Sequence, residues 1–121
     1  MTQKQWKTKI KKACTAAGTY RPFFDAVIDT LAGILERRDK ALKYFEDEGG
    51  EVLVEHTNKA GSTNLEQNPA LRLVNDLNRD ALTYWRDLGL TPAGLKKLNE
   101  TMLKPDNGKK GLADALSELG I

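Results

Sequence analysis

The strongest constraint in this chain is an apolar repeat that follows Pro22. Its members recur at alternating spacings of four and three, with Arg38 at the one seam position that is not apolar: Phe24, Ile28, Leu31, Leu35, Leu42 and Phe45. Such spacing places the apolar side chains on one face of an α-helix. Proline suits the first helical turn and Gly49-Gly50 supplies a stop, so the repeat predicts a helix over about residues 22–48.

A second long helix is predicted to begin at Pro69, with Asn68 as its N-cap. Gly89 is placed to end this helix, and Thr91-Pro92 is placed to cap a short third helix. Residues 88–92 (LGLTP) therefore predict a tight corner between two helices. Antiparallel pairing of the long helices would bury both apolar faces. The residues expected in the core or in an oligomer interface are Phe24, Ile28, Leu31, Leu35, Leu42, Phe45, Leu71, Val74, Trp85 and Leu88.

The segment between the long helices is too long for a bare loop in a compact domain. Residues 51–56 alternate and contain β-branched valines, and Asn58 to Gly61 has the composition of a turn. This pattern predicts a β-hairpin near residues 51–66, with the return strand at about 62–66. The predicted fold class is therefore mainly α, with a small hairpin between paired helices.

Charge is distributed unevenly along the chain although its formal net value is only +2. Residues 1–21 contain six basic and no acidic side chains, whereas residues 22–68 contain five basic and ten acidic ones. If the leader is helical, its lysines can face outward while Trp6 and Ile10 dock on the core. The excess of positive charge suggests a polyanionic partner such as DNA, or an acidic patch on another protein. We expect the main contacts with a polyanion at Lys4, Lys7, Lys9, Lys11 and Lys12, and secondary contacts at Lys96, Lys97, Lys109 and Lys110. The alternative is a disordered leader that only aids solubility.

The sequence offers little for catalysis or for holding a metal ion. Cys14 is the only cysteine and His56 the only histidine, and no glycine-rich phosphate loop is present. We therefore expect no enzyme activity, no cofactor and no metal. The acidic run at 46–48 is better explained as solvated surface than as a cation site, because consecutive helical residues point in different directions. Neither a membrane span nor a signal peptide is evident, which predicts a cytosolic protein.

The LGLTP corner also allows a helix-turn-helix reading, in which the segment from Pro92 to Glu100 would enter a DNA groove with Lys96 and Lys97. Such a motif favours a small residue four positions before the turn glycine, where this chain has Trp85. A packing corner is the simpler interpretation. A dimeric transcription regulator is kept as the alternative function, and a structural adaptor without a nucleic-acid role as a third.

Several short motifs occur in an order that resembles phage terminase small subunits. These are Gly18-Thr19-Tyr20, residues 32–39 (AGILERRD), Gly49-Gly50, Thr57-Asn58 with Gly61, residues 68–71 (NPAL) and residues 88–92 (LGLTP). The resemblance spans about residues 18–98. It implies a non-enzymatic DNA-packaging subunit of a tailed phage or prophage, which assembles as a ring, binds double-stranded viral DNA at the packaging-initiation region and serves the large ATPase and nuclease subunit in the host bacterial cytoplasm.

The chain is expected to divide into a basic segment (1–21), a helical core (22–103) and a loosely ordered tail (104–121). The tail is rich in glycine and proline and ends in an amphipathic stretch. Since it falls outside the resemblance, its role rests on physical reasoning alone. We expect its apolar face to contact the terminase large subunit through Leu112, Leu116 and Leu119.

Overall fold

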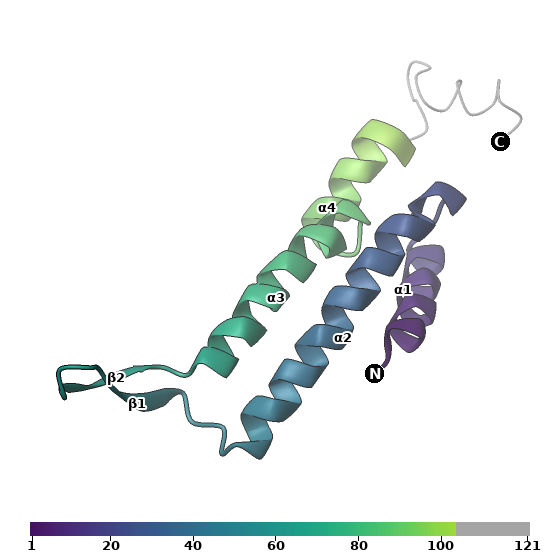
Figure 1. Cartoon of the computed structure of the whole chain (residues 1–121). Coiled ribbons are helices and arrows are strands. Elements are labelled where there is room, and N and C mark those ends of the chain that lie inside the picture. Colours follow the sequence, from purple (N-terminus) through teal and green to yellow (C-terminus); the bar gives the residue numbers. More distant parts are fainter. Residues whose placement is uncertain (104–121) are drawn as a thin grey trace, which may run out of the picture.

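The computed structural model describes residues 1–103, which form three long helices side by side, with α2 between α1 and α3 (Figure 1). The elements are α1 (Gln3–Ala17), the short turn η1 (Pro22–Phe24), α2 (Asp25–Asp47), β1 (Leu53–Thr57), β2 (Thr63–Gln67), α3 (Pro69–Asp87), α4 (Pro92–Leu98) and the turn η2 (Asn99–Leu103). The predicted fold class is confirmed: the chain is mainly helical, with a small antiparallel hairpin between the long helices and a short helix after the corner.

The core lies where α2 packs against α1 and α3. Of the residues expected there, six are buried: Ile28, Leu31, Leu35, Phe45, Val74 and Leu88. Phe24, Leu42, Leu71 and Trp85 are half-buried and lie at the edges of the apolar faces. The difference follows from the narrow contact between single helices, since the flanks of each face stay open to solvent.

The helix ends are set by local side-chain and backbone hydrogen bonds. Thr2 caps α1 in a reciprocal capping box with Gln5, and Asn68 caps α3 by accepting from the N–H of Ala70. At the end of α3, Gly89 adopts a φ of 73° while its N–H donates to Arg86 and that of Leu90 donates to Trp85. This is the Schellman ending expected from the sequence.

Helix α2 begins slightly later than the sequence predicts. Residues Pro22–Phe24 form a separate 3₁₀ turn, and the α-helix starts at Asp25. The 3₁₀ turn is a common way to open a helix when the first residue is proline.

The β-hairpin projects from the end of the bundle at which α2 stops and α3 starts (Figure 1). Its strands pair antiparallel from Leu53 opposite Gln67 to Thr57 opposite Thr63. Asn68 joins the hairpin base to α3, because its N–H donates to the carbonyl of Val52 and its side-chain amide donates to that of Glu51.

The corner between α3 and α4 requires two glycines for different reasons. A Cβ atom on Gly89 would lie 2.7 Å from Cδ1 of Leu98 and 2.9 Å from Cγ2 of Thr19. A Cβ atom on Gly94 would lie 2.1 Å from the carbonyl oxygen of Arg86. The small residue that allows α4 to approach α3 is therefore Gly94, in α4, rather than the position of Trp85 in α3.

Candidate nucleic-acid interface

The basic segment of the chain forms α1, which is fixed along α2 by its apolar side. Ile10 and Cys14 are both 0% exposed, and burial raises the pKa of the Cys14 thiol although a hydrogen bond with Thr19 opposes this. Gly33 of α2 lets α1 approach closely, since a Cβ atom there would lie 3.3 Å from Nε2 of Gln3. One side of α1 is thus committed to the core, and its other side is left to solvent.

A polar cluster around Asp39 holds the N-terminal half of α1 in place. The indole N–H of Trp6 donates to Oδ2 of Asp39 at 2.7 Å, and Arg38 donates from Nε to Oδ1 at 2.9 Å. Burial of the Asp39 carboxylate opposes its ionisation, but hydrogen bonds from Trp6, the amino group of Met1 and Arg38 outweigh that effect and lower its pKa. The backbone N–H of Gln3 also donates to Glu36 at 3.0 Å.

The lysines of α1 do not all have the same surroundings. Lys4, Lys9, Lys11 and Lys12 are exposed. Lys7 is half-buried, and its Nζ lies 3.8 Å from Oδ1 of Asp29. Helical spacing alone groups Lys7 with Lys4 and Lys11, but the packed helix turns it toward α2, where Asp29 offsets part of its charge.

The exposed lysines of α1 keep their charges available. Among the residues that the structure describes, Lys4, Lys9, Lys11 and Lys12 have no carboxylate within 4.0 Å. Lys9 lies over the ring of Trp6 and Lys11 over that of Tyr20, each with Nζ 5.1 Å from the ring centroid. These cation–π contacts orient the side chains without neutralising them.

A second basic surface lies at the corner. Lys96 and Lys97 are exposed on α4, and Arg86 of α3 lines the same hollow of about 390 Å³ as Lys97. Sequence reasoning did not identify Arg86, because only the corner brings it next to α4; no local pattern signals that proximity. Asp87 lines the same hollow, so a carboxylate offsets part of the positive charge of this surface.

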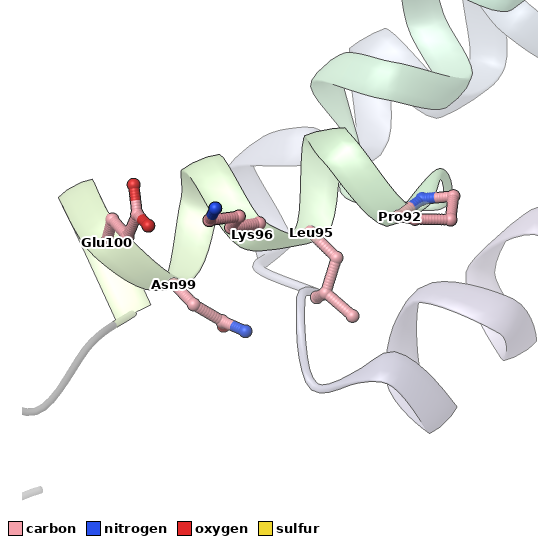
Figure 2. Close-up of a pocket in the computed structure, with 5 residues that line it drawn as sticks. All are labelled: Pro92, Leu95, Lys96, Asn99 and Glu100. Carbon is pink, nitrogen blue, oxygen red and sulfur yellow. The ribbon is translucent and has the colours of Figure 1, made fainter.

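An apolar hollow of about 560 Å³ lies along α4 and η2 and is lined by Pro92, Leu95, Lys96, Asn99 and Glu100. Figure 2 shows Leu95 and Asn99 pointing to one side of this segment, while Lys96 and Glu100 point to another. The hollow is open, and its lining lacks convergent catalytic groups.

The remaining predicted site residues are in the tail. Lys109, Lys110, Leu112, Leu116 and Leu119 lie outside the described residues.

The family model of the phage terminase small subunit matches residues 2–103 of the chain. The chain belongs to the phage terminase small subunit family. The predicted family is therefore confirmed, and the match includes the basic helix α1, which the resemblance of short motifs did not reach. No curated protein and no solved structure is similar enough to be matched.

Residues 1–103 hold no group of three or more histidine, cysteine or acidic side chains arranged to bind a metal ion. In the same part of the chain, no helix is both long and apolar enough to cross a membrane.

Proposed function

We propose that this terminase small subunit binds double-stranded viral DNA at the packaging-initiation region through α1 and recruits or regulates the large ATPase and nuclease subunit. The family supports a role in phage genome packaging. We place the subunit in the host bacterial cytoplasm. The observation that carries the proposal is the orientation of α1, whose apolar side is buried while Lys4, Lys9, Lys11 and Lys12 face solvent. The subunit performs no chemistry itself and needs no cofactor.

Exposed lysines on a fixed helix are better suited to contacting the phosphates of the DNA backbone than to recognising individual bases. Each lysine that neutralises a phosphate releases condensed counterions, so DNA affinity falls as salt rises. A ring of subunits would present the same helix many times, and multivalent contact would raise the avidity well above that of one chain. Lys96 and Lys97 extend the basic surface as secondary contacts.

The test compares two variants that lose equal charge at different places. Lys4→Gln/Lys11→Gln removes exposed lysines of α1, whereas Lys59→Gln/Arg72→Gln removes exposed basic side chains from the hairpin turn and α3. Duplex affinity is measured across a salt series after light scattering has shown equal oligomer masses. The α1 variant should bind more weakly, and the slope of log affinity against log salt should flatten by about 0.9 for each lost phosphate contact. Equal effects of both variants would contradict a specific role for α1.

A helix-turn-helix regulator remains the alternative function, because α4 carries Lys96 and Lys97 on an exposed corner. The regulator hypothesis predicts a different DNA-binding site and a different oligomer mass. Lys96→Gln/Lys97→Gln would then abolish binding while the α1 variant would not, and the protein would be a dimer. The family match favours the packaging role.

We propose that the tail recruits the large subunit through Leu112, Leu116 and Leu119. A change of all three leucines to serine should weaken binding to the purified large subunit while leaving oligomer mass and DNA affinity unchanged. A matched control changes Ser117 to Ala in the same segment. Loss of the oligomer in the leucine variant would instead place these residues in the assembly interface.

A further inference from the structure

The β-hairpin exposes apolar side chains that nothing in the described chain covers. Val52 is 58% exposed, Leu53 is 53% exposed and Leu65 is 66% exposed. In the described part of the chain, the strands pack extensively only against each other. An isolated two-stranded hairpin is marginally stable in water, and exposed apolar strands are typical of interaction sites. The hairpin therefore has the properties of an element that is completed by another surface.

The strand register defines the chemistry of one hairpin face. Glu55 pairs with Leu65, and Leu53 lies two residues before Glu55, so these three side chains share a face. The hairpin and its flanks, residues 51–67, contain three glutamates and one lysine. A surface that accepts this face should combine an apolar or aromatic side chain with basic neighbours.

Such a surface exists on α2, just beyond the part that α1 covers. Gly33, Arg37, Lys40 and Tyr44 follow one another at spacings of four, three and four, which places them on one side of the helix. Gln3 of α1 covers this side at Gly33. Further along, Tyr44 is 61% exposed, and Arg37 and Lys40 are exposed beside it. Nζ of Lys40 lies 4.0 Å from Oε1 of Glu36, whereas Arg37 has no carboxylate within 4.0 Å in the described part of the chain.

The two surfaces lie at the same end of the molecule but on opposite sides. Tyr44 lies three residues before the end of α2, which is the end from which the hairpin emerges. Gly33, which shares this side of α2 with Tyr44, is covered by Gln3 of α1. The hairpin, in contrast, extends beyond α3 (Figure 1). The hairpin is thus directed away from its own Tyr44 and toward a molecule placed beside α3.

We propose that the hairpin of one copy packs on the Arg37, Lys40 and Tyr44 surface of the next copy. Leu53 and Leu65 cover the Tyr44 ring, and Glu55 approaches Lys40 and Arg37. This contact is head-to-tail, because each copy offers the hairpin on one side and the α2 surface on the other, and head-to-tail contacts close into rings when the rotation between copies allows it. The inference rests on the proposed function, in which the subunit acts as a ring.

The test uses variants that each damage one half of the contact. Leu53→Ser/Leu65→Ser alters the hairpin, and Lys40→Glu/Tyr44→Ala alters the α2 surface; all four residues are exposed, so the helical bundle should keep its circular dichroism spectrum. Asn64→Ser is the control, because Asn64 pairs with His56 on the opposite hairpin face. Masses are measured by native mass spectrometry.

The wild type and Asn64→Ser should form the same large assembly, and each interface variant alone should be monomeric. An equal mixture of the two interface variants should form one-to-one pairs, since one intact hairpin can meet one intact α2 surface. Retention of the wild-type mass by either variant, or no pairing in the mixture, would overturn the contact. A monomeric wild type that still binds DNA would overturn the proposed contact between copies and leave the proposed DNA role standing. A wild type that assembles but does not bind DNA would overturn the DNA role and leave the contact standing.

Discussion

The indole nitrogen of Trp6 lies 2.7 Å from Oδ2 of Asp39, and this hydrogen bond joins the basic helix α1 to the central helix α2. Arg38 also lies over the Trp6 ring, with Cζ 5.7 Å from its centroid. The contact fixes which side of α1 faces the core. It therefore also fixes which lysines face solvent, and the proposed DNA surface depends on it.

Replacing Trp6 by phenylalanine should lower the free energy of unfolding by about 1–3 kcal/mol, because the hydrogen bond to a charged carboxylate is lost and Asp39 loses a partner. The measurement is urea denaturation followed by circular dichroism. Thr83→Val is a suitable control, since Thr83 is exposed on α3 and the change removes one polar group at nearly constant volume. Equal denaturation midpoints for Trp6→Phe and the wild type would show that the indole contact does not stabilise the fold.

The Asp39 carboxylate should make the free energy of unfolding fall as the pH is lowered into the acid range. Its pKa is lowered in the folded protein, so its stabilising effect is complete above the ordinary aspartate pKa of about 3.9 and is lost as pH falls through the lower folded pKa. The stability difference between the wild type and Asp39→Asn should therefore be largest near neutral pH and shrink below about pH 4. Urea denaturation at a series of pH values measures it. A difference that grows on acidification would contradict the assignment.

Gly89 and Gly18 provide a matched pair for separating backbone strain from steric overlap. Both end a helix with positive φ, 73° and 78°, but a Cβ atom at Gly18 has no atom within 4 Å, whereas one at Gly89 would overlap Leu98 and Thr19. Gly18→Ala should cost about 1 kcal/mol through strain. Gly89→Ala should cost about 1–3 kcal/mol more through overpacking. Equal urea midpoints for the two variants would show that the corner is less tightly packed than the structure indicates.

A charge in the core of α2 should prevent folding and assembly together. Leu35 is 1% exposed, so Leu35→Asp would bury an unpaired carboxylate and cost at least about 3 kcal/mol. Leu73→Asp is the control, because Leu73 is 50% exposed on α3. Size-exclusion chromatography and circular dichroism report the two effects. A soluble Leu35→Asp protein of native mass would contradict the position of the core.

Local chemistry made much of the fold predictable. The spacing of four and three in α2, Asn68-Pro69 before α3, and Gly89 after it act within a few residues, so the sequence indicates these helix boundaries directly. The hairpin was predictable for the same reason. The position of the basic patch could also be inferred, because six positive charges without an acid are visible in any reading of residues 1–21.

Tertiary packing decided the features that join distant residues. Lys7 turned toward Asp29 only because α1 docks on α2 at Gly33, and Arg86 came beside Lys97 only because Gly94 allows α4 to approach. Helical periodicity identifies which residues share a face, but it does not state which face a neighbouring helix will cover. That choice depends on interactions between segments far apart in the chain, such as Trp6 with Asp39, and so it appears only in the folded structure.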